Sequence, residues 1–379
     1  MSCKKKITKL VGLALIVMFS LQGKAQETVF SQYYNNPVLY NPGLIGADLG
    51  MKVRFQYRDQ WSNLPGNFNT INFNMDIAER NIPGSGGLAV MFNRKQEGQG
   101  FLEKTVLGIG TSVRIPLQEN IVTHLGFMGS FVEQKVNWSN LVFSDQFDQR
   151  YGDVFPTAFT PPATGQGAVR YPDIVIGNII RFFPYAYSVD KIIGTLGFAV
   201  HHALEPEDSY LGLESKVPRK YVAHGNMMWI NQQAGNSRNS EGFSGITKYD
   251  FGFLFESWQK RSNYAVGVNV MRSNLYLGTW FRGESYGELS SNAVVFMLGL
   301  NYTMADNATM KIMYSYDWDL NELVSISGPT HELTLIFQMD DVMMFGKSDN
   351  FRDRGYSGGS FGNRNSGGII QQPLECSPF

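Results

Sequence analysis

The chain has 379 residues, of which 43% are hydrophobic, 13% aromatic and 17% charged, with 32 Lys and Arg against 33 Asp and Glu. A disordered chain requires high charge and few aromatic residues, and a nucleic-acid-binding chain requires a basic excess, so neither class fits. The 40 glycines exceed average usage, and the length suits two or three soluble domains or one large β-structure.

Residues 1–25 have the pattern of a secretory signal peptide. Lysines at positions 4–6 and 9 precede the short apolar stretch Leu10–Leu21, and Gly23 and Ala25 are small residues that suit cleavage after Ala25. The apolar stretch is too short for a membrane-spanning helix. We therefore expect export, and loss of this segment would leave Cys376 as the only cysteine, which excludes an intrachain disulfide and a cysteine-based metal site.

Segments of alternating apolar and polar residues follow along most of the remaining chain. In the first of them, Val53, Phe55 and Tyr57 alternate with Arg54 and Arg58. Since successive strand residues point to opposite faces, each segment has one apolar and one polar face. The segments are 51–61, 68–77, 86–93, 104–115, 120–136, 173–187, 192–203, 219–230, 247–258, 262–271, 273–282, 293–303, 308–316 and 330–339.

These segments predict an all-β fold, a transmembrane antiparallel β-barrel of about 14 strands (12–16) in the bacterial outer membrane over residues 51–340. Many are near the length of about 9–11 residues with which a tilted strand crosses a bilayer. A soluble β-sandwich also alternates, but its strands are shorter and it tends to carry more surface charge, so we favour the barrel.

The connections alternate in length, as in outer-membrane barrels with short periplasmic turns and long outer loops. If the first strand runs outward from the periplasm, the outer connections are 137–172, 204–218, 283–292 and 317–329. Two connections break the rule, since 231–246 is long and 259–261 is short. One miscounted strand between them would explain both.

Two flanking regions lack the alternation. Residues 26–50, with Pro37 and Pro42, form an expected periplasmic or plug segment, and for its 30–46 part we favour a plug that closes the barrel over a strand that docks a partner. Residues 341–379 become rich in Gly and Ser and are expected to form a flexible periplasmic tail.

The sequence offers little for catalysis. Metalloprotease, P-loop, nucleophile-elbow and dinucleotide-binding motifs are absent, and we expect no catalytic, cofactor-binding or metal-binding residues. His201 and His202 are adjacent in a strand and should face opposite ways. His331 with Glu332 and Ser315 is the one combination that resembles a hydrolase, but His331 and Glu332 should also lie on opposite faces.

Polar residues on the first two segments predict a network inside the barrel. Arg54, Arg58, Asn72, Asn74 and Asp76 share the non-lipid face. Their mixed charges favour salt bridges that hold neighbouring strands in register over a charged constriction that selects solutes.

Aromatic residues near strand ends predict a girdle at the membrane interface, which is favoured over a carbohydrate-stacking surface. The residues expected in it are Tyr57, Trp61, Trp229, Trp258, Trp280 and Trp318.

Short motifs spread along the chain resemble one known family. They are Phe30-Ser31-Gln32-Tyr33-Tyr34-Asn35-Asn36-Pro37, Asn41-Pro42-Gly43, Tyr57-Arg58-Asp59-Gln60-Trp61, Leu141-Val142-Phe143-Ser144-Asp145-Gln146-Phe147-Asp148, Pro218-Arg219-Lys220-Tyr221, Tyr314-Ser315-Tyr316-Asp317 and Gly328-Pro329-Thr330-His331-Glu332-Leu333. In order and spacing they resemble the PorP/SprF family of type IX secretion system outer-membrane proteins of Bacteroidetes. Departures from the family pattern include Gly43, where Ala is commoner, Pro329, where Ser is commoner, and the extended Gly-rich C-terminal tail.

The resemblance singles out positions that either bind a partner or maintain the fold. They are Phe30, Ser31, Gln32, Tyr33, Asn36, Pro37, Asn41, Pro42, Tyr57, Arg58, Gln60, Trp61, Asp145, Gln146, Asp148, Arg219, Tyr221, Ser315, Tyr316, Asp317, His331 and Glu332.

What the resemblance implies is a non-enzymatic secretion component of the outer membrane, associated with export of large adhesins and, in gliding bacteria, with motility. Its implied partners are membrane lipid, other type IX components, and either the C-terminal domain of a secreted adhesin or a periplasmic peptidoglycan-binding protein. The outer loops 137–172, 204–218 and 317–329 would hold the adhesin at the surface. The alternative is a transport channel for small or hydrophobic solutes.

Overall fold

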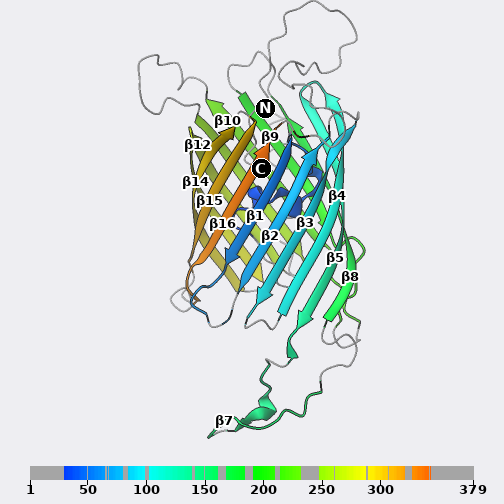
Figure 1. Ribbon diagram of the computed structural model, residues 1–379, viewed down its shortest axis with the longest axis vertical. Coiled ribbons are helices and arrows are strands. Elements are labelled where there is room, and N and C mark those ends of the chain that lie inside the picture. The colour runs from blue at the N-terminus through cyan, green and yellow to red at the C-terminus, as the bar shows by residue number, and fades with distance from the viewer. Residues whose placement is uncertain are drawn as a thin grey trace, which may run out of the picture.

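A computed structural model of the chain shows a closed antiparallel β-barrel (Figure 1). The structure describes residues 30–342 except for 49, 65, 67, 80–83, 99–101, 139–140, 149, 161–167, 184–190, 210–213, 232–246, 260, 287–288, 306, 321–326 and 341. The expected signal peptide (1–25), residues 26–29 and the expected tail apart from Val342 lie outside the described residues, and so does Cys376. Among the described residues, no helix has the length and apolar character needed to cross a membrane.

Fourteen strands of the described chain form the barrel, as the alternation predicts. Each pairs with its neighbour in chain order, and β1 closes the ring by pairing with β16. The strands are β1 (Met51–Asp59), β2 (Asn69–Ala78), β3 (Ser85–Glu97), β4 (Leu102–Gln118), β5 (Ile121–Val136), β8 (Ala168–Phe182), β9 (Lys191–His201), β10 (Lys220–Asn231), β11 (Thr247–Trp258), β12 (Arg261–Arg272), β13 (Leu275–Tyr286), β14 (Leu289–Ala305), β15 (Ala308–Asp319) and β16 (Thr330–Met339).

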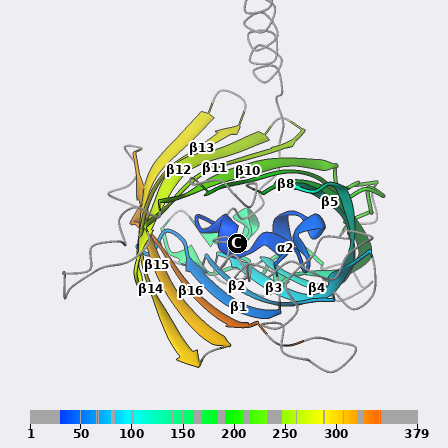
Figure 2. The same ribbon diagram turned by 90° about the horizontal axis from the view of Figure 1, so that it is seen from above.

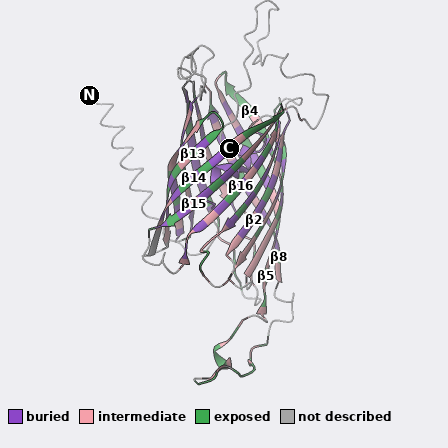
Figure 3. Cartoon of the chain, turned by 60° about the vertical axis from the view of Figure 1, so that its left-hand side comes forward, coloured by how far each residue is buried: buried purple, intermediate pink, exposed green. Residues whose placement is uncertain are grey.

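Side chains alternate between the lumen and the outer surface, and buried residues alternate with more exposed ones along the strands in Figure 3. In β1, Lys52, Arg54 and Arg58 are buried inside the barrel, whereas Phe55 and Tyr57 are exposed on its outer face. Exposed apolar side chains on a closed barrel are the side chains that lipid covers. The polar side chains therefore fill the lumen.

The proposed miscounted strand is wrong. Asn231 of β10 pairs directly with Thr247 of β11, so the connection between them leaves the barrel count unchanged. Trp258 pairs with Arg261 across the next connection, which is a tight hairpin in which Gln259 has a φ of 48°. A tight hairpin needs no long loop, and the two exceptions are separate features of a fourteen-stranded barrel.

Two neighbouring strands of one long wall, β3 and β4, are longer than the sequence predicts. Strands β3, β4, β5 and β8 have 13, 17, 16 and 15 residues, and the connection from β5 to β8 continues beyond them. We call its residues 141–160 the arm; it contains η4 (Ser144–Gln146) and the short pair β6 (Phe147–Asp148) and β7 (Gly152–Asp153). Figure 1 shows the arm extending away from the barrel, with β7 at its tip. We call this end of the barrel the arm end and the other, where β1 begins, the turn end.

Residues 30–48, which we call the plug, lie inside the ring of strands (Figure 2). They form no strand, but the short helices η1 (Tyr33–Asn35), α2 (Pro37–Tyr40) and η2 (Pro42–Leu44). Pro37 and Pro42 each occupy the first position of a helix, where a missing N–H costs nothing. The plug therefore occupies the lumen as a chain of tight turns.

Two tryptophans of the predicted girdle are instead inside the barrel. Trp280 is 2% exposed and Trp258 is 3% exposed, because both share the inward face of their strands. Trp280 stacks on Tyr34 of the plug, and Trp258 lies against the cations of Lys220 and Arg261. A position near the end of a strand does not reveal whether a side chain faces the lumen or the lipid. The predictions for Trp258 and Trp280 are therefore wrong.

The expectation for the adjacent histidines is also wrong. His201 and His202 are both buried, since β9 ends at His201 and His202 has a φ of 54°, which turns the backbone. His201 Nε2 lies 2.9 Å from the carbonyl oxygen of Tyr40, and His202 Nδ1 lies 2.8 Å from Asp173.

Candidate functional site

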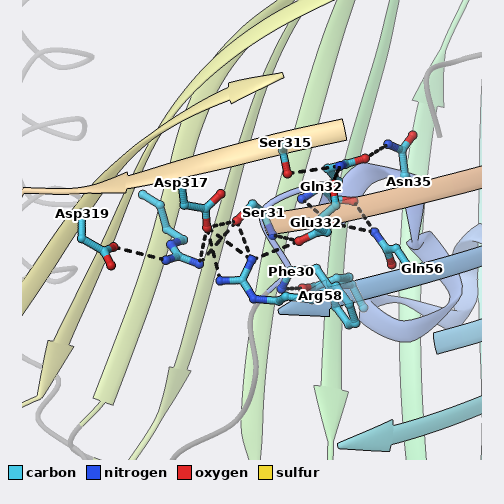
Figure 4. A network of polar contacts seen from close by, with 12 residues as sticks. Phe30, Ser31, Gln32, Asn35, Gln56, Arg58, Ser315, Asp317, Asp319 and Glu332 are labelled. Atoms are coloured by element: carbon cyan, nitrogen blue, oxygen red, sulfur yellow. Dashed lines mark hydrogen bonds and ion pairs between the residues drawn. The ribbon is translucent and has the colours of Figure 1, made fainter. Parts of the chain in front are cut away.

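A buried polar network joins the start of the plug to the strands that close the barrel (Figure 4). Its residues come from the plug, β1, β13, β15 and β16, and we call them the seam cluster. They are Ser31, Gln32, Gln56, Arg58, Arg282, Ser315, Asp317 and Glu332.

Arg58 is the centre of the seam cluster. Its guanidinium donates to Ser31 Oγ at 2.8 Å, to Glu332 Oε2 at 3.0 Å and to Asp317 Oδ2 at 3.2 Å. The Arg58 side chain is 1% exposed, and both carboxylates are fully buried. Breaking a buried ion pair leaves a charge that neither water nor a partner solvates, so the cluster stabilises only the arrangement in which all of its members are present.

Glu332 connects the plug backbone to the barrel. Its two carboxylate oxygens accept the backbone N–H groups of Ser31 at 2.9 Å and Gln32 at 3.0 Å. Gln56 donates to the same carboxylate, and the Gln32 side chain donates to Ser315 Oγ at 3.1 Å. These bonds fix both the position and the direction of the chain that enters the plug.

Apolar contacts hold the plug against the two remaining walls. Tyr33, Tyr34 and Tyr40 pack into a cluster with Tyr276 and Trp280, on the side of β9 to β15. On the other side, Val38 and Ile45 pack against inward residues of β3, β5 and β8, such as Met91, Met128 and Val175. The plug therefore crosses the lumen from one wall to the other.

Glycines on three neighbouring strands receive the turn at Asn41 and Pro42. A Cβ atom at Gly126 would lie 2.0 Å from the Pro42 carbonyl carbon, and one at Gly177 would lie 2.0 Å from Asn41 Oδ1. A Cβ atom at Gly197 would lie 2.2 Å from His224 Nε2, which is itself 2.9 Å from Asn41 Nδ2. The absence of side chains at these positions makes the close approach of the plug backbone possible.

Charged residues fix the last part of the plug at the turn end. Asp48 pairs with Lys52 and, at 3.2 Å, with Arg181 Nη1. Burial alone would raise the pKa of Asp48, but the charges of Lys52 and Arg181 outweigh it and lower the pKa to about 2. Close by in the chain, Gly46 N–H donates to Asp76, which also pairs with Arg54.

The motif residues predicted from the sequence separate into groups. Ser31, Gln32, Arg58, Ser315, Asp317 and Glu332 come together in the seam cluster. Phe30, Tyr33, Asn36, Pro37, Asn41 and Pro42 are buried elsewhere in the plug. Tyr57, Tyr221, Tyr316 and His331 lie on the outer face of the barrel, and Gln60, Trp61 and Arg219 lie near its arm end.

The three residues that resemble a hydrolase site do not come together in the structure. His331 lies outside the barrel, where Tyr314 Oη is 2.7 Å from its Nδ1, while Glu332 and Ser315 are buried in the lumen. The expected opposition of His331 and Glu332 is thus confirmed. The described residues also contain no group of three or more His, Cys, Asp or Glu side chains placed to hold a metal ion.

The remaining motif residues, Asp145, Gln146 and Asp148, shape the arm. Asp145 accepts the N–H of Ala158 and the hydroxyl of Thr157, and the first of these bonds lowers the pKa of Asp145. The backbone oxygen of Gln146 accepts two N–H groups, and Asp148 caps the turn at Arg150. The polar groups of these three residues form hydrogen bonds within the arm. The arm also exposes large hydrophobic side chains, which are Val142, Phe147, Tyr151, Val154 and Phe155.

Several residues of the site were missed. Gln56, Arg181 and Arg282 have the polar, inward character that alternation predicts, but nothing in the sequence tells which of them the plug contacts. Asp48 was missed because it lies in the plug, where the sequence does not alternate. The three glycines that contact the plug turn could have been noticed in the sequence. Gly126, Gly177 and Gly197 all lie on the inward face of their strands, which is a weak sign of a close approach.

The profile of one family, described as type IX secretion system membrane protein PorP/SprF, matches residues 22–337. The chain belongs to the PorP/SprF family. It is therefore an outer-membrane β-barrel of the type IX secretion system, and its family links it to the other components of that system. A search of curated proteins finds no match.

Solved structures resemble this PorP/SprF barrel only at the level of fold. The CymD monoaromatic hydrocarbon channel is 9% identical with a TM-score of 0.39, over 83% of this chain and 92% of that one. A Pseudomonas aeruginosa FadL homologue is 11% identical with a TM-score of 0.36, over 79% and 92%. The P. putida toluene transporter TodX is 8% identical, also with a TM-score of 0.36, over 82% and 95%.

Replacing Arg58 by Met should destabilise the protein by about 3–5 kcal/mol, because Asp317 and Glu332 lose the buried cation that they share. The free energy of unfolding in urea, followed by tryptophan fluorescence in detergent, measures the change. Arg94→Met is the matched control at an exposed ion pair and should cost no more than about 1 kcal/mol. Equal effects of the two substitutions would contradict the central role of Arg58.

Replacing Gly126 by Ala should displace the plug turn and cost about 1–3 kcal/mol, since the new Cβ overlaps the Pro42 carbonyl group. Gly129 lies on the same strand, and a Cβ there meets no atom within 4 Å. Gly129→Ala should therefore leave the unfolding midpoint unchanged. A Gly126→Ala protein as stable as Gly129→Ala would show that the plug does not sit on this surface.

The pKa of Asp48 predicts a loss of stability in acid. Because the folded pKa of about 2 lies below the usual value of about 3.9, the carboxylate stabilises the fold above pH 4. This contribution, about 2 kcal/mol, is lost as the pH falls from 4 towards 2. The free energy of unfolding of wild type should exceed that of Asp48→Asn at pH 7, and the difference should vanish near pH 2. A difference that does not change with pH would contradict the lowered pKa of Asp48.

Proposed function

We propose that the protein is a non-enzymatic component of type IX secretion that holds a large secreted adhesin at the cell surface. In this proposal the chain is exported by a signal peptide cleaved after Ala25, and the arm end faces the outside of the cell. The adhesin's C-terminal domain binds there. In a gliding bacterium, the same attachment would serve motility.

The position of the plug carries the proposal. A transport channel needs a continuous path through its lumen, whereas here Tyr33, Tyr34 and Val38 bridge the two walls and the seam cluster fixes the chain between them. This arrangement favours a scaffold over the alternative of a channel for small or hydrophobic solutes. A scaffold must present its binding surface outside the barrel.

The arm supplies such a surface. It connects two long strands, β5 with 16 residues and β8 with 15, and its internal hydrogen bonds hold it in a defined shape. Tyr151 is 70% exposed and Phe147 is 58% exposed, and Val154 and Phe155 are more than half exposed. Exposed aromatic side chains on a shaped loop are typical of protein-binding surfaces. Strands β9 and β15 end, and β10 and β16 begin, at the arm end. In this proposal the connections 204–218 and 317–329 contribute further contacts to the adhesin.

Replacing Phe147, Tyr151 and Phe155 together by Asn should strongly reduce the amount of adhesin on the cell surface, by about tenfold or more if they are central to the contact. Adhesin-specific antibody labelling of intact cells measures display, and heat-modifiable migration of the barrel confirms that it is folded. The control on the same arm is Ser144→Ala with Thr160→Ala. Unchanged display in the aromatic triple variant would refute the arm as the attachment site.

A tagged protein purified from outer membranes separates the two partners implied by the family. Recovery of a very large secreted protein, lost in the aromatic triple variant, supports surface attachment. Recovery of a periplasmic peptidoglycan-binding protein, unaffected by those substitutions, would replace this proposal by a role as an envelope anchor.

A further inference from the structure

Charged side chains cross the outer face of the long wall, which consists of β3, β4, β5 and β8, at the arm end (Figure 1). The structure describes these four strands completely, and most of their outward-facing side chains are apolar or uncharged. The charged residues on this outward face all lie near the arm end of their strands. We call them the belt; they are Arg94, Glu103, Glu133, Lys135 and Arg170.

The belt begins where the apolar surface of the long wall stops. Phe92, Leu107 and Phe131 are aligned in register across β3, β4 and β5. Lipid tails cover such outward-facing apolar side chains. Two residues further towards the arm end, the outward positions of β3 and β5 carry Arg94 and Glu133. The belt therefore lies at the level of the lipid headgroups.

Ion pairs join the belt residues along and across the strands. Arg94 Nη2 lies 3.0 Å from Glu103 Oε1. Glu133 pairs with Lys135 at 2.8 Å and with Arg170 at 2.7 Å. Three cations thus share two carboxylates, and the belt carries one excess positive charge.

The cations of the belt are more exposed than its carboxylates. The side chains of Arg94, Lys135 and Arg170 are 48%, 52% and 62% exposed, whereas those of Glu103 and Glu133 are 29% and 22% exposed. Arg170 bonds Glu133 through Nε and Nη2, which leaves the N–H groups of Nη1 for another acceptor. A negatively charged group with several oxygens complements such cations best.

The spread of the cations selects the size of the ligand. Arg94 on β3 and Arg170 on β8 are separated by three strand spacings, since the order of the wall is β3, β4, β5, β8. This separation is about 14 Å. A single phosphate cannot contact both ends of the belt, whereas a sugar headgroup that carries two or more anionic groups can.

We propose that the belt binds lipopolysaccharide of the outer leaflet through the anionic groups of its sugar headgroup. This inference rests on the orientation given above, in which the arm end faces the outside of the cell. The acyl chains cover the row of Phe92, Leu107 and Phe131, and the headgroup accepts N–H groups from the three cations. The bound lipid fixes the level of β5 and β8 in the membrane, and with it the base of the arm.

Native mass spectrometry of the detergent-purified wild-type protein measures this binding. The protein would be titrated with deep-rough lipopolysaccharide, whose headgroup carries several anionic groups, with phosphatidylglycerol, which carries one, and with zwitterionic phosphatidylethanolamine. Lipopolysaccharide should bind about tenfold or more tightly than either phospholipid. Equal affinity for lipopolysaccharide and phosphatidylglycerol would contradict the proposed headgroup.

Two sets of substitutions break the same ion pairs but differ in their effect on an anionic lipid. Arg94→Gln, Lys135→Gln and Arg170→Gln together should weaken lipopolysaccharide binding by about tenfold or more, because the cations are lost. Glu103→Gln with Glu133→Gln removes the carboxylates that compete with the lipid, and this variant should bind at least as tightly as wild type. Heat-modifiable migration in gels confirms that both variants are folded.

The results of the two variants decide the proposal. Equal lipopolysaccharide binding in wild type and the triple cation variant would refute it. An equal loss of binding in the cation and carboxylate variants would also refute it, because the ion pairs alone would then explain the effect.

The lipid measurement is independent of the adhesin. The variant with Phe147, Tyr151 and Phe155 replaced by Asn should bind lipopolysaccharide like wild type, because these side chains lie on the arm and not on the belt. Unchanged adhesin display in that variant would refute the attachment site and leave the lipid site intact. Absence of lipopolysaccharide binding to the wild-type protein would refute the lipid site alone.

Discussion

The width of the lumen is the constraint on which the rest of the structure depends. Side chains alone fill a barrel of about eight strands, but the diameter grows with strand number. Fourteen strands leave a lumen that must contain water or another part of the protein. Here the N-terminal segment occupies it, and a chain placed there must satisfy every backbone group that it takes out of water. This requirement explains why inward positions carry so many polar side chains.

Each wall meets that requirement in a different way. The seam, where β1 pairs with β16, offers charges, and Glu332 accepts two plug N–H groups while Arg58 neutralises it. The wall of β9 to β15 offers aromatic surface, and the wall of β5 to β9 offers glycines that let the backbone come close. Because these contacts lie on several sides, the plug and the closed barrel support each other. In the proposed function, such a filled barrel presents its loops at the cell surface.

Much of this could be predicted from the sequence because a barrel strand has a period of exactly two residues in the side-chain direction. Alternation gave the fourteen strands, and it placed Arg54 and Arg58 on the inner face. The expectation of an aromatic girdle failed for Trp258 and Trp280, since an aromatic side chain near a strand end can face the lumen as well as the lipid. Alternation could not reveal that Arg58 meets Asp317 on the far side of β16, because that contact depends on how β1, β16 and β15 are ordered and aligned. It could not reveal that Asp48 meets Arg181 either, because that contact depends on the path of the plug.

The central claim, that the plug closes the lumen, is tested most directly by ion conductance of the purified wild-type protein in planar lipid bilayers. The account predicts no steady conductance, because the plug packs against the walls on both sides of the lumen. A large, steady conductance of the kind expected for an open fourteen-stranded channel would contradict it.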